Sequence, residues 1–338
     1  MHVPMPPAAD APALRAASWV PLWAASGVPA SVQASVHAGL RVWVRLWVRS
    51  WVRLWLRKWG RTWAPGLPGA IVMLMLLSAG SAAHAQLPSG DDPEASAIWQ
   101  KVRASLFEGR SIAPAGADTL VLEAPSRAID AAVVPIAIHT RLPQTPAAYV
   151  SRVYLLIDAN PSPIAAIFHF TPDSGRADIE TRVRVDAYSF VRAVAETSDG
   201  RLFMATRYVK ASGGCSAPAG TDARAALASM GQMRFRIEGD MAGTVPVLAQ
   251  LQIQHPNHSG LAMDQSTRQY TPAHFVRRVD ISYAERPILS ADVDFSISEN
   301  PVFRFYFLPR GPGALQASVV DSQDLRFGAT LAQRESRR

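Results

Sequence analysis

The chain has 338 residues and a formal net charge of +7, and its isoelectric point is near 10. The length allows about two domains. The positive charge is confined to the start: residues 1–85 hold eight Lys and Arg residues against one acid, so residues 86–338 carry 26 basic and 26 acidic residues. Because residues 86–338 have no basic surplus, the high isoelectric point is no argument for nucleic acid binding, and no nucleic acid partner is expected.

The first 85 residues do not have the pattern of a folded domain. From Trp43 to Trp63 a tryptophan occurs at every fourth position, and arginine is nearly as regular. On a helix this period would place both residue types on neighbouring stripes, as in a helix that lies on an anionic membrane surface. The alternative is a tandem nucleotide repeat that is translated from upstream of the true start codon. The regularity of the repeat favours this alternative.

A secretory signal follows the repeat. The segment 69–77 is apolar and stands behind basic residues, and the segment 78–85 consists mostly of small residues that end in an A-x-A pattern. This order predicts cleavage after Ala85. The apolar segment is too short for a membrane span, and no later segment is apolar enough to anchor the chain. The mature protein is therefore expected to be periplasmic and not membrane-spanning.

A short helix is predicted at the start of the mature chain. Asp92 is a suitable N-cap, Pro93 suits the first helical position, and Gly109 would end the helix. Apolar residues at helical spacing would form its buried side, namely Ala97, Trp99, Val102 and Leu106. Beyond this helix the pattern changes to a period of two, which is typical of strands.

Strands with polar turns make up the rest of the mature chain. Between 92 and 210, short runs are separated by turns that contain Pro, Gly, Asp or Asn. These runs are 119–123, 133–138, 150–157, 164–170, 179–185 and 190–195. A second set is 233–238, 247–253, 276–283, 287–293, 302–307 and 314–321. The pattern predicts an all-β protein with two immunoglobulin-like β-sandwich domains in tandem, over residues 92–210 and 230–330.

Residues 211–229 join the two sets and are rich in Gly and Ala, which is typical of an exposed linker. They contain the only cysteine of the chain, Cys215, which follows Gly213 and Gly214. It cannot form an internal disulfide, although the predicted compartment is oxidising. A structural cysteine usually has apolar neighbours, and Cys215 has none. We therefore predict an exposed reactive thiol, with Lys210 as the nearest cation in sequence; an idle loop cysteine is the alternative.

Other patterns that could carry chemistry are weak. His255, His258 and His274 could suggest a metal site, but Pro256 places the first two in a turn, and no carboxylate or thiol stands at a matching spacing. Neither a metal site nor a cofactor is therefore predicted. The nucleophile-elbow, phosphate-loop and dinucleotide-binding motifs do not occur in the sequence, so the chain is not expected to be an enzyme.

Short motifs along the mature chain resemble two sulfur-oxidation proteins. The first set resembles SoxY and comprises 133–136 (Val-Val-Pro-Ile), 160–163 (Asn-Pro-Ser-Pro), 181–184 (Thr-Arg-Val-Arg), 193–195 with 199–200, and 210–215 (Lys-Ala-Ser-Gly-Gly-Cys). The second set resembles SoxZ and comprises 253–256, Pro272 with 275–276, 279–284, 296–301, Asp321 and Phe327. In this order the motifs are similar to the fused SoxYZ-like carrier that is associated with quinoprotein dehydrogenases.

The resemblance implies a sulfur carrier and not an enzyme. Cys215 would be the covalent attachment point of a sulfur intermediate, as in thiosulfate oxidation, and Gly213 and Gly214 would be the hinge of its arm. The implied partners are sulfur-oxidation proteins, or a quinoprotein dehydrogenase and its c-type cytochrome. Ser216 and Ala217 stand where SoxY has further glycines, and the arm continues into the second domain, so it would reach less far.

Two other functions stay open at this point. The chain could be an accessory binding module for a quinoprotein alcohol dehydrogenase or its cytochrome, with Cys215 incidental. It could also be a redox chaperone or sensor that forms one mixed disulfide with a protein partner. Capture of a protein on the thiol, in place of inorganic sulfur, would favour the last of these.

Overall fold

The computed structural model describes residues 92–218, 223–241, 243–264 and 267–332. The predicted leader, with its repeat and the cleavage point after Ala85, lies outside the described residues, as does part of the predicted linker 211–229. Among the helices that are described, none is long and apolar enough to cross a membrane.

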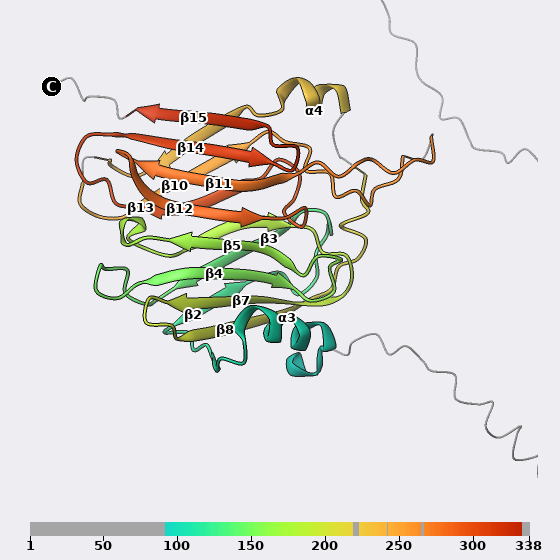
Figure 1. Cartoon of the computed structure of the whole chain (residues 1–338), viewed down its shortest axis with the longest axis horizontal. Coiled ribbons are helices and arrows are strands. Elements are labelled where there is room, and N and C mark those ends of the chain that lie inside the picture. The colour runs from blue at the N-terminus through green and yellow to red at the C-terminus, as the bar shows by residue number, and fades with distance from the viewer. Residues whose placement is uncertain (1–91, 219–222, 242, 265–266, 333–338) are drawn as a thin grey trace, which may run out of the picture. The chain divides into compact units, whose positions relative to one another are not determined.

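Two β-sheets pack face to face in this part of the chain (Figure 1). One has nine strands in the order β1-β8-β7-β4-β5-β12-β11-β14-β15, and the other has six in the order β2-β3-β6-β13-β10-β9. The strands are β1 (Ile112–Pro114), β2 (Leu120–Glu123), β3 (Val134–Thr140), β4 (Val150–Ile157), β5 (Ile164–Phe170), β6 (Ile179–Val183), β7 (Ser189–Thr197), β8 (Leu202–Val209), β9 (Met233–Glu238), β10 (Val247–Ile253), β11 (Val276–Tyr283), β12 (Arg286–Val293), β13 (Val302–Phe307), β14 (Ala314–Asp321) and β15 (Arg326–Ala332). The helices are η3 (Pro93–Ala95), α3 (Ala97–Phe107), η4 (Pro172–Ser174) and α4 (Ala223–Ser229).

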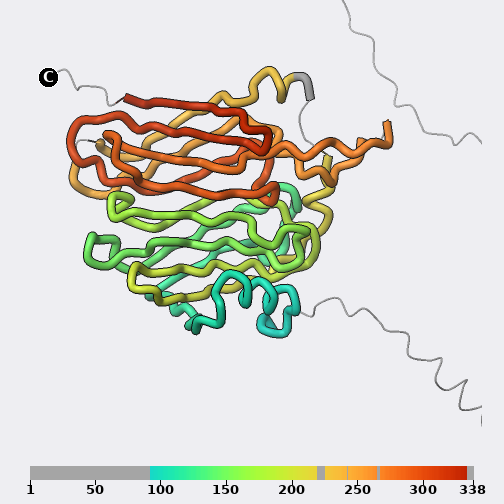
Figure 2. Tube along the Cα trace, viewed as in Figure 1, coloured from blue at the N-terminus to red at the C-terminus, as the bar shows by residue number. Residues whose placement is uncertain are grey.

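The two halves of the chain share both sheets. In the nine-stranded sheet, β5 of the first half pairs with β12 of the second, so that Phe170 lies opposite Leu289. In the six-stranded sheet, β6 pairs with β13, and Glu180 lies opposite Arg304. The prediction of an all-β fold is confirmed, and the structure adds that the two sandwiches are continuous with one another. Figure 2 shows strands of the first half in green beside strands of the second half in orange and red.

Alternation along the strands decides which side chains enter the shared core. In β13, Phe303, Phe305 and Phe307 are buried, whereas the residues between them are partly exposed. Phe168 of β5 meets Phe303 edge to face, with 6.2 Å between the ring centroids. Because Phe168 and Phe303 come from different sheets and different halves, this contact joins both the layers and the domains.

Helix α3 covers part of the outer face of the nine-stranded sheet. Every residue of β7 is buried, as expected for a strand that is covered on both faces. Trp99 and Phe107 of α3 are buried, and the ring of Phe107 lies 5.0 Å from that of Tyr154 in β4. The backbone of Glu108 is left-handed, with a φ of 48°, and ends the helix. The predicted helix is therefore present, with its apolar side on the sheet.

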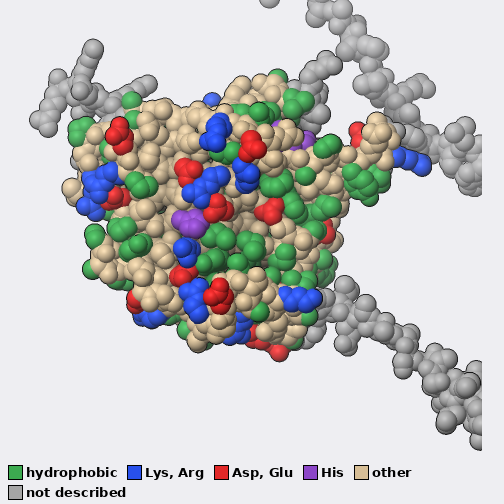
Figure 3. Space-filling model, viewed as in Figure 1, with side chains coloured by type: hydrophobic (Ala, Val, Ile, Leu, Met, Phe, Trp, Pro, Cys, Tyr) green, Lys and Arg blue, Asp and Glu red, His purple; other side chains and the backbone are tan. Residues whose placement is uncertain are grey.

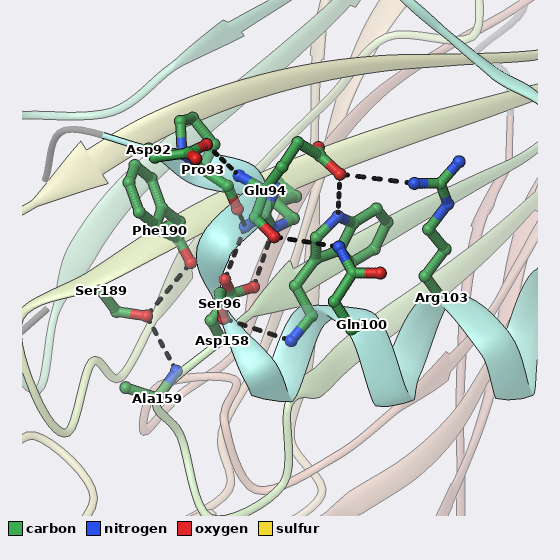
Figure 4. A network of polar contacts seen from close by, with 12 residues as sticks. Asp92, Pro93, Glu94, Ser96, Gln100, Arg103, Asp158, Ala159, Ser189 and Phe190 are labelled. Atoms are coloured by element: carbon green, nitrogen blue, oxygen red, sulfur yellow. Dashed lines mark hydrogen bonds and ion pairs between the residues drawn. The ribbon is translucent and has the colours of Figure 1, made fainter.

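The helical region begins with two successive caps, which Figure 4 shows. The Asp92 carboxylate accepts a hydrogen bond from the backbone N–H of Glu94 at 2.9 Å and starts η3. The Ser96 hydroxyl then accepts one from the N–H of Trp99 at 3.2 Å and starts α3. Glu94 also accepts the indole N–H of Trp99 at 3.2 Å and pairs with Arg103 at 3.4 Å. The predicted cap at Asp92 is real, but it serves the short turn that precedes the main helix.

Polar contacts lie at the junction of the halves on the outer face of the nine-stranded sheet, and the one between His169 and Asp292 crosses it. Asp292 of β12 lies 2.7 Å from Arg278 of β11 and 2.8 Å from His169 of β5. Arg278 also lies 2.8 Å from Asp280. Figure 3 shows charged side chains of both signs in a band across the middle of this face. Exposed ion pairs contribute little to stability, so their main effect is on the alignment of neighbouring strands.

A buried ion pair fastens the helical region to the sheet. The Arg192 side chain is 0% exposed, and its Nε and Nη2 lie 2.8 Å and 2.7 Å from the two carboxylate oxygens of Asp158. Nη2 also donates to the carbonyl of Pro93 at 2.6 Å. The guanidinium carbon lies 4.5 Å from the centre of the Trp99 ring. One guanidinium thus binds a turn, η3 and α3 together.

Removal of Arg192 should destabilise the fold strongly. In Arg192→Met the buried carboxylate of Asp158 loses its partner, and breaking a buried ion pair costs about 3–5 kcal/mol. The measurement is the free energy of unfolding in urea. Arg201→Met is the matched control, because its pair with Asp199 is exposed, at 64% and 57%, and should contribute less than about 1 kcal/mol. Equal losses in the two variants would contradict this role of Arg192.

Candidate functional site

The segment that carries the only cysteine follows β8 and is docked against both halves of the chain. The N–H of Gly213 donates to the carbonyl of Asp186 at 2.7 Å, and the N–H of Cys215 donates to the Asp186 carboxylate at 3.3 Å. The Ser259 hydroxyl donates to the carbonyl of Cys215 at 2.5 Å. Because Asp186 belongs to the first half and Ser259 to the second, the arm bridges the two.

Two glycines allow the arm to dock so closely. Gly213 has a φ of +79°, in the left-handed region that favours glycine. A Cβ at Gly214 would overlap the carbonyl oxygens of Ala131 and Val185, so no side chain fits there. Both glycines are therefore required by the docked conformation, and their role as a hinge stays a prediction.

The Cys215 side chain is fully buried, with 0% of its surface exposed. The prediction of an exposed thiol is therefore wrong for the docked arm, because loops from distant parts of the chain close over it. Burial raises the pKa of the Cys215 thiol to about 12, and the carboxylates of Asp186 and Asp294 add to this rise, whereas Arg184 opposes it. A thiol with this pKa is protonated at neutral pH and is a poor nucleophile.

The cation that acts on the thiol is Arg184, while the predicted Lys210 is exposed. Arg184 follows β6 and is only 4% exposed. Its Nη2 donates to the carbonyl of Asn257 at 3.1 Å, its Nη1 lies 3.5 Å from the carbonyl of Gly214, and its Nε has no hydrogen-bond partner among the described residues. Burial lowers the pKa of Arg184, and the adjacent Cys215 is the largest influence that opposes this shift.

Segments that carry the family resemblance meet beside the arm. The side-chain amide of Asn160 donates to the carbonyl of Arg184 at 2.8 Å and to the hydroxyl of Ser296 at 2.9 Å. Its oxygen accepts the backbone N–H of Asp186 at 2.9 Å. The backbone N–H of Arg184 donates to the carbonyl of Ser296 at 2.7 Å. One hydrogen-bonded platform, built from both halves, thus supports the arm.

A buried pair of histidines faces a carboxylate in the second half. Nε2 of His274 lies 2.7 Å from Oδ2 of Asp321, and Nε2 of His255 lies 3.5 Å from the same oxygen. The sequence showed no carboxylate at a suitable spacing, because Asp321 comes from β14, far along the chain. The three possible ligand atoms lie within 4.8 Å of one another, and two histidines with one carboxylate form a common zinc ligand set.

The protonation of His255 argues against a metal ion in this arrangement. Its Nδ1 accepts a hydrogen bond from the backbone N–H of Asn257 at 3.0 Å. A neutral imidazole that accepts at Nδ1 carries its proton on Nε2, the atom that a metal ion would need as a ligand. The group is therefore described as a His–Asp–His polar cluster, and the lack of a metal site stays a prediction.

The stability of the fold should decrease in mild acid because of His255. Burial lowers the pKa of His255 to about 4, and His274 adds to the shift. Below about pH 6.5 the unfolded chain binds a proton there that the folded chain does not, so the free energy of unfolding decreases by up to about 3 kcal/mol as the pH falls to about 4. Urea unfolding at neutral and acidic pH measures this loss. The His255→Gln variant should lose less than the wild type, and an unchanged loss would contradict the assignment.

The thiol should become more reactive when Asp186 loses its charge. In Asp186→Asn the amide oxygen still accepts the N–H of Cys215, but the carboxylate that raises the thiol pKa most after burial is gone. Because the amide is also a weaker acceptor for the arm than the carboxylate, the arm opens more often, and the rate of alkylation by iodoacetamide in mild alkali should increase about threefold or more. The matched control is Asp199→Asn, which neutralises an exposed acid that does not act on the thiol. An equal or slower rate in Asp186→Asn would show that these charges do not set the reactivity.

Two family models match the chain in tandem. The model of the sulfur oxidation protein SoxY matches residues 103–215, so that Cys215 is its last matched residue. The model of the sulphur oxidation protein SoxZ matches residues 236–332. A search of curated proteins found no match.

Solved structures resemble parts of the fold. The sulfur carrier protein SoxY from Chlorobium limicola f thiosulfatophilum is 24% identical, with a TM-score of 0.29, and the match covers 34% of this chain and 91% of that one. The superoxide reductase (neelaredoxin) from Ignicoccus hospitalis is 15% identical, with a TM-score of 0.25, and the match covers 27% and 79%. Fibronectin(III)-like modules of CbhA from Clostridium thermocellum are 12% identical, with a TM-score of 0.19, and the match covers 63% and 91%. Such low similarity carries no further argument. The two family models show the family: the chain is a SoxYZ-like fusion, with a SoxY domain followed by a SoxZ domain.

Proposed function

We propose that this chain is a periplasmic sulfur carrier that holds a sulfur intermediate covalently on Cys215 for partner redox enzymes in quinoprotein dehydrogenase systems. The tandem SoxY and SoxZ matches support a carrier-like role in sulfur oxidation, for example of thiosulfate. The observation that carries the residue assignment is the position of Cys215. This only cysteine is the last residue of the SoxY match and lies where segments of both domains meet.

The docked arm keeps the thiol in an unreactive form. Burial raises the pKa of Cys215 to about 12, so loading requires release of the arm. Release breaks the hydrogen bonds that hold the arm, and the shortest are those made by the N–H of Gly213 and the hydroxyl of Ser259. In water the thiol pKa returns to about 8.5, which increases the fraction of thiolate. Access to the sulfur and its reactivity therefore change together.

Exchange between sulfur–sulfur bonds accounts for loading without a cofactor. The released Cys215 thiolate attacks one sulfur of an S–S bond in the donor. A new S–S bond forms at Cys215, the donor bond breaks, and the displaced sulfur leaves with the electron pair. Attack by another thiol on the adduct reverses the step and returns the free thiol. The partner enzymes then supply the oxidation of the bound sulfur.

Exposed apolar side chains near the arm offer a surface for these partners. Ile129 is fully exposed in the loop that borders Gly214. Leu261 and Met263 follow Ser259, which binds the carbonyl of Cys215, and are 36% and 40% exposed. Exposed apolar groups that lie together mark interaction sites in soluble proteins, and we propose that these three side chains form one. A partner that covers this rim would also receive the released cysteine.

The carrier function is tested by the intact mass of the protein purified from the periplasm of sulfur-oxidising cells. Reducible mass increments of sulfur atoms or a sulfonate are expected on Cys215, because the thiol would be isolated with part of its cargo. These increments should be lost with a reductant and should not occur in Cys215→Ser. Ser216→Ala is the control that changes the neighbouring residue and keeps the thiol. A thiol that stays unmodified in such cells would contradict the carrier function.

The complete burial of Cys215 favours a second candidate, an accessory binding module for a quinoprotein alcohol dehydrogenase or its cytochrome. In that case the thiol is incidental and the rim near Ile129 and Leu261 does the binding. Capture of partners by Cys215→Ser separates the two functions. Unchanged partner capture together with unchanged growth of the host would favour the binding module. A protein trapped on Cys215 by a disulfide would favour a redox chaperone or sensor.

A further inference from the structure

Arg184 is a buried cation whose hydrogen bonds are incomplete. Its side chain lies next to the arm and is 4% exposed, yet Nε has no partner among the described residues, and the contact of Nη1 with Gly214 is long, at 3.5 Å. A buried N–H without an acceptor destabilises the fold, and a buried charge destabilises it more. The contact of Nη2 with Asn257 does not by itself account for the burial of the Arg184 guanidinium.

The other buried arginine, Arg192, has the partners that Arg184 lacks. Arg192 places two of its nitrogens within 2.8 Å of the carboxylate oxygens of Asp158, so its charge is matched and its donors are used. Around Arg184, in the described part of the chain, no carboxylate oxygen forms an ion pair with the guanidinium, and its acceptors are backbone carbonyls. Arg192 has the contacts of a structural residue, whereas Arg184 has N–H donors that are unpaired or weakly paired and could bind an anion.

The charges near the sulfur show why an anion there would need a cation. The carboxylates of Asp186 and Asp294 disfavour negative charge on Cys215, and Arg184 is the group that opposes them. A guanidinium has N–H groups in a fixed fork that suits the oxygens of a tetrahedral oxyanion. The weakly engaged Nη1 lies on the side of the arm, as its contact with the carbonyl of Gly214 shows.

We propose that Arg184 is a positioning residue that binds the sulfonate end of an adduct on Cys215, and so makes the site selective for cargo that ends in an oxyanion. This inference rests on the proposed carrier function. As the loaded arm returns, the sulfonate oxygens take the place of the Gly214 carbonyl on Nη1. An adduct that ends in a neutral group gains nothing from Arg184.

The test compares two adducts that are formed on the purified full chain. With tetrathionate, the Cys215 thiolate attacks an inner sulfur, the central S–S bond breaks, and thiosulfate leaves with the electron pair, so the adduct ends in a sulfonate. With methyl methanethiosulfonate, methanesulfinate leaves in the same way and the adduct ends in a neutral methyl group. The readout is the rate at which dithiothreitol removes each group, followed by intact mass.

Arg184→Gln should lose the sulfonate adduct about tenfold faster than the wild type, and its methyl adduct should be removed at nearly the wild-type rate. Arg184→Lys keeps the charge and should restore part of the protection. Arg182→Gln is the matched control, since Arg182 lies two residues earlier in β6 and is exposed. Equal acceleration of both adducts in Arg184→Gln would show a purely structural role and would overturn the proposal.

A second measurement needs no variant and so does not depend on how Arg184→Gln folds. Both wild-type rates are divided by those of the same adducts on a free peptide of residues 210–217. The protein should protect the sulfonate adduct more than the methyl adduct, and the reverse order would overturn the proposal. Loading by the methyl reagent but not by tetrathionate would also overturn it. The carrier function itself is decided separately, by the native mass, so the two failures are distinguishable.

Discussion

The pairing of β5 with β12 is the constraint on which the rest of the structure depends. It joins strands of the two domains in one sheet, so neither domain ends there in an edge of unpaired backbone groups. The pairing of β6 with β13 does the same in the other sheet. Loops of the two domains are thereby held side by side, and Asn160, Ser259 and Ser296 can build one platform for the arm. The site does not exist in either domain alone.

The thiol of Cys215 is fully buried in the docked arm. The arm places its sulfur where water is excluded and where two carboxylates disfavour the thiolate. In the docked state the thiol is therefore protonated and shielded, and the proposed carrier function requires release of the arm. Arg184, which lies beside the arm, forms no ion pair with a carboxylate among the described residues and has an unpartnered Nε, which distinguishes it from Arg192 in its pair with Asp158.

Strands with strict alternation could be predicted from the sequence, and the features that depend on distant contacts could not. The predicted runs 233–238 and 302–307 coincide with β9 and β13, because a period of two leaves one face apolar. The alternation within a strand does not determine which strand pairs with it, so the pairing of β5 with β12 and of β6 with β13 was not predicted. Cys215 and its glycines could be singled out by composition. The burial of Gly214 and Cys215, and the approach of Arg184 and Asp321 to their partners, depend on contacts between distant segments that no local pattern encodes.

The bridging position of the arm has one more consequence. Its backbone is bonded to Asp186 in one domain and to Ser259 in the other, so the docked arm acts as a clasp across the junction. Thermodynamic linkage makes this relation reciprocal: if opening the clasp loosens the junction, then any partner that loosens the junction must open the clasp by the same free energy. The docking equilibrium of the arm and the rigidity of the junction between the domains would then change together.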